Sequence, residues 1–190
     1  MRRFVLRGLL AAALASACMG GTAWAQNREK AWELYPYLGY VQFFKTTGLK
    51  DAASFGLNFA YHWTKKDEVE FGFGGTSTKD RLGAGVSADL ITAHANYIRN
   101  LFLQRRGKVV GFATAGAGVL NFSTFGSTAS LSVVGDETEL IYNYGLGMRF
   151  FGGRRAGFRI DGRRIRGTKN GTKDVYTEIT AGVTMILGGA

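Results

Sequence analysis

The sequence contains very little cysteine, proline or histidine: one cysteine, one proline and two histidines in 190 residues. Cys18 lies in an N-terminal segment that we expect to be removed, which leaves the rest of the chain without a disulfide or a thiolate site. His62 and His94 are too far apart in sequence to form a recognised metal motif. After residue 25, no apolar run is long enough for a transmembrane helix. We therefore predict no catalytic, cofactor or metal site.

Glycine and aromatic residues are abundant, with 28 glycines, 14 phenylalanines and 8 tyrosines. This composition favours β-structure with many turns, and 46% hydrophobic residues exclude a disordered chain. The formal net charge is +10, but the basic residues are scattered singly along the sequence instead of forming a stripe. We therefore predict no nucleic-acid partner.

The N-terminus has the pattern of a secretory signal peptide. Three arginines within the first seven residues precede the apolar run 8–21, and the small residues Ala23 and Ala25 follow at the positions that signal peptidase reads. The apolar run is too short to anchor the chain in a bilayer, which disfavours the alternative of an N-terminal anchor. We predict a signal peptide at 1–25 cleaved after Ala25, a short lead at 26–31 and a barrel domain at 32–190.

The rest of the chain alternates apolar and polar residues with a period of two, the pattern of half-buried strands. From Phe55 to Trp63, every odd position is aromatic or aliphatic and every even position is small or polar. Similar segments predict eight strands, at 32–43, 54–64, 68–75, 86–98, 109–122, 140–150, 158–163 and 175–187.

The predicted connections alternate between short and long. The short ones lie near residue 65, at 104–107 and at 152–155, and the long ones at 45–53, 76–84, 123–138 and 165–174. This alternation is typical of an outer-membrane barrel, with short periplasmic turns and longer outer loops. Eight strands of about ten residues fit the available length. We therefore predict an all-β fold: an eight-stranded antiparallel up-and-down transmembrane β-barrel preceded by a cleavable signal peptide.

The alternating faces can be assigned in two ways. A secreted soluble ligand-binding barrel would turn the apolar face inward, which would crowd a small interior with aromatic side chains. The opposite assignment places the apolar face in lipid, with Tyr61, Trp63 and Phe150 as candidates for an aromatic girdle. The polar face then fills the lumen, where opposite charges can pair. The predicted lumenal charge network consists of Glu70, Arg149, Arg159, Asp161, Arg163 and Glu178.

Four short motifs resemble one family in their order and spacing. They are ELYPYLGY at 33–40, GAGV at 116–119, NYGLGMRF at 143–150 and RIDGR at 159–163. The pattern resembles the small outer-membrane β-barrel proteins of Gram-negative bacteria, of the OmpA/OmpX type. The resemblance implies a narrow, side-chain-filled barrel that is rooted in the bacterial outer membrane as a monomer. It also implies contacts with outer-membrane lipid, lipopolysaccharide and the barrel assembly machinery.

The predicted function is a non-enzymatic one: a structural role, surface interaction or minor permeation of small solutes. One alternative is a lipid A acyl-modifying enzyme, because His94 and Asn96 resemble a His-x-Ser arrangement. Asn96 cannot act as a nucleophile, and the alternation turns His94 toward the lumen. The acidic residues Asp136, Glu137 and Glu139 fall in the predicted third long loop, where we expect a solvated charged surface.

Overall fold

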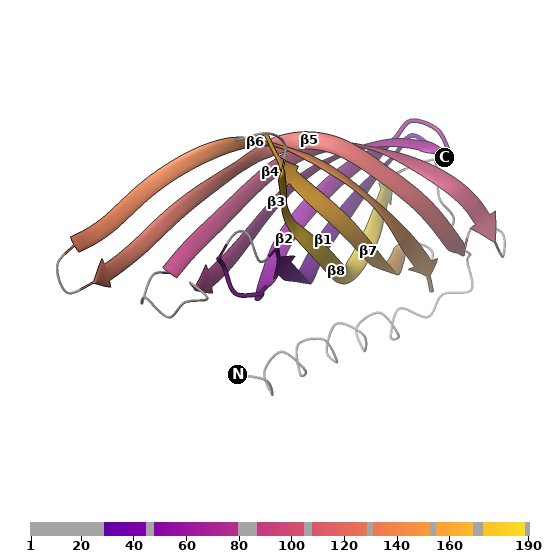
Figure 1. The fold of residues 1–190 in the computed structure, drawn as a ribbon. Coiled ribbons are helices and arrows are strands. Elements are labelled where there is room, and N and C mark those ends of the chain that lie inside the picture. Colours follow the sequence, from indigo (N-terminus) through magenta and orange to yellow (C-terminus); the bar gives the residue numbers. More distant parts are fainter. Residues whose placement is uncertain are drawn as a thin grey trace.

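The structure, a computed structural model, describes residues 29–44, 48–79, 87–104, 108–128, 131–152, 155–168 and 173–188. Eight antiparallel strands pair in chain order, and β8 pairs with β1 to close a barrel (Figure 1). The strands are β1 (Ala31–Phe43), β2 (Ala52–His62), β3 (Asp67–Lys79), β4 (Ser87–Gln104), β5 (Val109–Thr128), β6 (Leu131–Phe151), β7 (Ala156–Gly167) and β8 (Lys173–Gly188). The predicted eight-stranded up-and-down barrel is confirmed.

The predicted signal peptide and its cleavage site after Ala25 lie outside the described residues and stay predictions. Among the residues that the structure does describe, no helix is long and apolar enough to cross a lipid bilayer.

The register of the strands makes the barrel narrow. Pairing followed from Glu33 through all eight strands returns to β1 at Phe43, ten residues farther along the same strand. Strand number and this stagger together determine the radius of a barrel, and eight strands leave an interior that side chains can fill.

Three strands extend about six residues or more beyond the bounds that the sequence pattern predicts. β4 continues to Gln104, and β5 and β6 remain paired up to Thr128 and Leu131. The predicted loop at 123–138 is therefore wrong, and Asp136, Glu137 and Glu139 belong to β6. In Figure 1 this hairpin, salmon and orange, reaches beyond its neighbours. The segment is rich in serine, threonine and valine, and the last two of these favour extended backbone.

The outer surface of the barrel is apolar. Phe55, Leu140 and Leu146 are each more than 60% exposed, and exposed aromatic or aliphatic side chains alternate with inward-facing residues along every strand. This is the facing predicted for a barrel in lipid and the reverse of a soluble ligand-binding barrel. A belt of this kind is stable only where hydrocarbon takes the place of water.

Aromatic side chains gather on the outer surface at the end of the short turns. Trp32 and Tyr61 have ring centroids 4.9 Å apart, and those of Trp63 and Tyr97 are 6.4 Å apart. Phe150 lies one residue from the end of β6 and is 40% exposed. The three predicted girdle residues therefore lie at one end of the barrel, where Trp32 and Tyr97 join them.

The core of the protein lies in the lumen. At the short-turn end, the lumen is filled by an apolar cluster of Ala31, Val110, Phe151 and Ile186. A larger apolar cluster lies toward the long connections and contains Val41, Phe43, Ala88, Leu90, Leu120, Ile141, Ile165 and Tyr176. Fully buried charged side chains occupy the lumen as well, and they form the candidate site.

Candidate functional site

Three arginines on β6 and β7 bind the buried carboxylates of the lumen. Arg159, Asp161 and Arg163 alternate along β7 and so point to the same face, and Arg149 lies on the neighbouring strand β6. The side chains of Arg149 and Arg159 have no solvent exposure, and Arg163 is 4% exposed. A buried charge is tolerated only with close partners of opposite charge, so the contacts of each arginine decide whether the fold is stable.

Arg149 binds the carboxylates nearest the short-turn end. Its Nε donates to Oε1 of Glu33 at 3.1 Å, and its Nη2 donates to Oε2 of Glu68 at 2.7 Å. The Nη1 atom donates to both Glu68 and the Oδ1 atom of Asn100. Its guanidinium also lies 4.5 Å from the ring centre of Phe112. Arg149 therefore has a bidentate carboxylate contact and an aromatic face, both favourable for a buried guanidinium.

Arg159 lies at the centre of the network. Its Nη1 is 2.7 Å from Oε2 of Glu70 and 3.2 Å from Oε1 of Glu33, while Nη2 is 2.8 Å from Oδ2 of Asp161. The guanidinium also packs over the rings of Tyr35 and Phe112, at 4.4 and 4.7 Å from their centres. One side chain thus joins carboxylates from β1, β3 and β7.

Arg163 continues the network toward the long connections. Its Nη2 donates to Oε1 of Glu70 at 2.8 Å, and its Nε donates to Oδ1 of Asp161 at 3.2 Å. Its Nη1 lies 3.0 Å from Nε2 of His94. Since a guanidinium can only donate, this ring nitrogen accepts, and His94 is held in the lumen by a member of the network.

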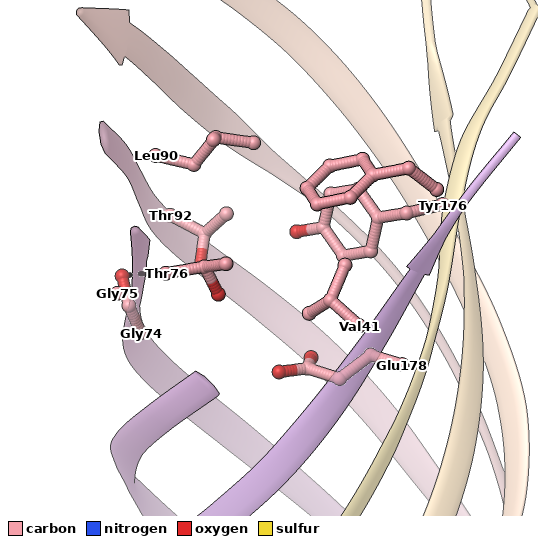
Figure 2. A pocket seen from close by; sticks show the side chains of 9 residues that line it. Val41, Gly74, Gly75, Thr76, Leu90, Thr92, Tyr176 and Glu178 are labelled. Carbon is pink, nitrogen blue, oxygen red and sulfur yellow. Dashed lines mark hydrogen bonds between the residues drawn. The ribbon is translucent and has the colours of Figure 1, made fainter. Parts of the chain in front are cut away.

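Glu178 lies beside Arg163 in the register of β7 and β8 but is not joined to the other predicted network residues by an ion pair. Its Oε1 accepts a hydrogen bond of 2.6 Å from Oγ of Ser54, and within the described ranges it forms no ion pair with an arginine. Figure 2 shows its side chain beside a small cavity that Thr76, Thr92 and Tyr176 also line. The cavity volume of about 10 Å³ has room for about one water molecule. The structure therefore brings together Glu70, Arg149, Arg159, Asp161 and Arg163.

The network also contains residues outside the predicted set, namely Glu33, His62, Glu68 and Asn100. The period-two pattern contained the signal for them. Glu68 has the same parity as Glu70 on β3, and His62 occupies the polar face of β2. The pattern does not show which residue each of them contacts across the lumen.

His62 bridges two carboxylates. Its Nε2 lies 2.9 Å from Oε2 of Glu33, and its Nδ1 lies 3.0 Å from Oε1 of Glu68. All three side chains are fully buried. Nε2 is hydrogen-bonded to Glu33, whereas Nδ1 lies within ion-pair distance of Glu68 without the alignment of a hydrogen bond. Because a carboxylate lies on each side of the ring, we infer that the ring is protonated and positively charged. The network then balances four positive groups, the three arginines and His62, against four carboxylates, those of Glu33, Glu68, Glu70 and Asp161.

We expect the two histidines to differ in charge in the folded protein at neutral pH. Nitrogen chemical shifts of the folded, isotope-labelled protein should show two protonated nitrogens for His62 and one for His94, because His94 accepts from Arg163. His62→Ala and His94→Ala identify the two sets of signals. A neutral His62 ring would contradict the balanced network.

Glu33, His62 and Glu68 also have a geometry that a metal ion can use, since their ligand atoms lie within 4.8 Å of one another. Arg149, however, donates to both carboxylates of this cluster. A bound cation would have to lie next to this guanidinium, and the contacts are those of an ion-pair network. Both carboxylates of the cluster therefore already have a guanidinium partner within the protein.

A sequence scan against protein-family models finds no match, and a search of curated proteins finds none either. Solved structures do resemble the barrel. Neisserial surface protein A is 15% identical with a TM-score of 0.62, covering 81% of this chain and 96% of its own. The N-terminal β-barrel domain of OprF from Pseudomonas aeruginosa is 13% identical with a TM-score of 0.58, covering 84% and 99%.

The outer membrane protein OprG, also from Pseudomonas aeruginosa, is 14% identical with a TM-score of 0.50, covering 87% of this chain and 99% of its own. All three are eight-stranded outer-membrane barrels. The chain therefore has the fold of a small eight-stranded transmembrane β-barrel of the outer-membrane type, as the motif pattern predicts.

Proposed function

We propose that this protein is a non-enzymatic integral protein of the bacterial outer membrane, a monomer whose lumen is closed by side chains. Its role is structural or lies in surface interaction, with at most minor permeation of small solutes. One observation carries the proposal: charge-balanced ion pairs between two apolar clusters fill the lumen. A narrow barrel filled in this way has no open aqueous path.

The orientation of the barrel follows from its connections. Ala31 pairs with Gly188, so the two ends of the barrel chain meet, and the connections β2–β3, β4–β5 and β6–β7 lie at the same end. In outer-membrane barrels the end that carries only short turns faces the periplasm. The opposite end here carries the connections 44–51 and 80–86 and the protruding β5–β6 hairpin. The apolar belt would then contact outer-membrane lipid, with lipopolysaccharide at the opposite end, and the barrel assembly machinery would insert the chain.

The contacts of His94 and Asn96 support a non-enzymatic role. His94 accepts from Arg163, and Asn96 donates through Nδ2 to Glu70 at 3.1 Å, so both side chains belong to the lumenal network. A lipid-modifying enzyme needs its base and nucleophile where an acyl chain can reach them. The comparison of lipid A by mass spectrometry, with and without the gene, should therefore show no change in acylation. A change that His94→Ala abolishes would assign the enzymatic function instead.

Fractionation and gel migration of the same protein test its outer-membrane location and the closure of its barrel. Expressed with its N-terminal segment, the protein should appear in the sarkosyl-insoluble outer-membrane fraction. It should also migrate differently on gels when it is not heated, because a closed barrel resists unfolding by detergent. Recovery from the soluble periplasm, or migration unaffected by heating, would contradict the proposal.

A further inference from the structure

Glu178 is a further lumenal carboxylate beside a network whose charges are already balanced. Its direct neighbour in the register, Arg163, donates with each of its three guanidinium nitrogens to other lumenal residues. Glu178 instead accepts a hydrogen bond of 2.6 Å from Oγ of Ser54, and a hydroxyl donor lies about 2.5 to 2.7 Å from an ionised carboxylate. The described part of the lumen therefore holds one carboxylate that forms no ion pair, and such a charge is costly away from bulk water.

Oxygen atoms from three strands line the cavity next to this carboxylate. Figure 2 shows Thr76 of β3 and Thr92 of β4 on one side of the cavity, and Tyr176 and Glu178 of β8 on the other. The hydroxyl of Thr92 donates to the carbonyl oxygen of Gly74 at 3.5 Å, so its lone pairs are left for another group. No lysine, arginine or histidine is among the described residues that line this cavity. The cavity thus offers one negative charge and several neutral oxygen atoms.

Two inward-facing glycines make room for this arrangement. Gly39 on β1 lies between Ser54 of β2 and strand β8, and a Cβ atom there would overlap Oγ of Ser54. Because Gly39 has no side chain, Ser54 reaches across β1 to Glu178. Gly74 on β3 lines the cavity itself, where a Cβ atom would lie 3.1 Å from Oγ1 of Thr92. The two glycines therefore permit both the hydrogen bond to the carboxylate and the space beside it.

A second cavity adjoins the first and contains a buried amide without partners. The two cavities share Thr92, Tyr176 and Glu178 in their lining, and each has a volume of about 10 Å³. Asn143 lines the second cavity and is 4% exposed, yet neither its Oδ1 nor its Nδ2 has a hydrogen-bond partner among the described residues. An amide buried in this way indicates a polar ligand in the space beside it. Arg163 also lines the second cavity, which therefore suits a water molecule better than a cation.

We propose that the first cavity binds one alkali-metal cation through the carboxylate of Glu178, and that a water molecule in the second cavity joins this cation to Asn143. The described polar side chains of the first cavity are all oxygen donors, which suit hard cations. One positive charge balances Glu178, whereas a divalent ion would leave an excess of positive charge close to Arg163. The cavity has room for about one water molecule, which excludes organic cations. The site lies inside the barrel, so it goes beyond the proposed role and does not depend on the membrane orientation.

Urea unfolding of the protein in detergent micelles tests the site. Sodium chloride is compared with the chloride of N-methyl-D-glucamine, an organic cation too large for the cavity, at the same ionic strength. Above the dissociation constant, each tenfold rise in sodium should raise the ratio of folded to unfolded wild-type protein about tenfold, because the cation binds only the folded barrel. Glu178→Gln should remove this dependence. In N-methyl-D-glucamine chloride, Glu178→Gln should unfold no more readily than the wild type, since its lumen has no unmatched charge.

Variants of the cavity and matched controls separate the site from general effects of salt. Thr92→Val removes one hydroxyl of the cavity and should raise the sodium concentration required severalfold. Thr114→Val removes a buried lumenal hydroxyl that lines neither cavity, and Asp89→Asn removes an exposed carboxylate on β4. Both controls should depend on sodium like the wild type.

Two results would overturn the proposal. The first is that sodium does not stabilise the wild type, or stabilises Glu178→Gln or Thr92→Val equally well. The second is an infrared band of a protonated carboxyl group that Glu178→Gln removes, because a proton would then neutralise Glu178 in place of a cation. Heat-modifiable migration of the same samples reports the closed barrel independently, so failure of the cation site is distinguishable from failure of the proposed function.

Discussion

Arg159→Met is expected to destabilise the barrel by about 3 to 5 kcal/mol, the usual result when one member of a buried ion pair is removed. Methionine fills much of the same space, but Glu70 and Asp161 would each lose a partner that is within 3 Å in the native protein. Arg163 contacts both carboxylates and cannot neutralise them alone. Urea unfolding of the protein in lipid vesicles, followed by tryptophan fluorescence, measures the change.

Arg99→Met provides the control for this prediction. Arg99 also forms an ion pair, with Asp67, but its side chain is 51% exposed at the end of the barrel. Exposed ion pairs contribute about 1 kcal/mol or less, so this variant should unfold almost like the wild type. Equal destabilisation by the two substitutions would show that the buried lumenal ion pairs contribute no more to stability than an exposed ion pair. The double variant Arg159→Met with Glu70→Gln should lose less free energy of unfolding than the sum of the losses in the two single variants. The reason is that one carboxylate no longer needs a partner.

Gly182→Val is expected to prevent most of the protein from closing into a barrel. An added Cβ at Gly182 would overlap the carbonyl oxygen of Pro36 and lie 2.9 Å from the Cα atom of Tyr37. Both are backbone atoms of the adjacent β1, which cannot move without breaking the pairing that closes the barrel. The folded, heat-modifiable fraction after refolding in detergent should fall severalfold.

Gly162→Val is the matched substitution on the neighbouring strand β7. Open space surrounds its Cβ position, so this variant should refold like the wild type. The comparison separates the loss of conformational freedom at a strand glycine, which both variants share, from the steric conflict at the closing strand pair. Similar folded fractions for the two variants would show that the spacing of β1 and β8 can adapt.

The sequence predicts whether most side chains face the lumen or the outer surface, because successive side chains of a strand point to opposite sides with a fixed period of two. This pattern identified the eight strands, the lipid-facing surface and five residues of the central network. It could not predict the partners across the lumen. Glu33 and Arg149 are 116 residues apart in sequence, and only the register around the closed barrel brings them together.

Glu178 shows a second limit of the sequence pattern. Glu178 and Arg163 are direct neighbours in the register of β7 and β8, and both were predicted to face the lumen. The side chain of Arg163 nevertheless turns toward Glu70 and Asp161, while Glu178 accepts from Ser54. Which partner each side chain contacts depends on the direction it takes in a crowded lumen, and the period-two pattern does not give that direction. The length of the β5–β6 hairpin was missed for another reason: serine, threonine and glycine are common in loops as well as in long strands.

Buried, balanced charges close the lumen, and current through the protein in a planar lipid bilayer measures this closure. The wild-type protein should show little steady conductance, since the ion pairs lie between two apolar clusters and leave no continuous aqueous path. Arg159→Met, which breaks the centre of the network, should conduct measurably more in its folded, heat-modifiable form. Large, stable wild-type channels would show that the lumen is open.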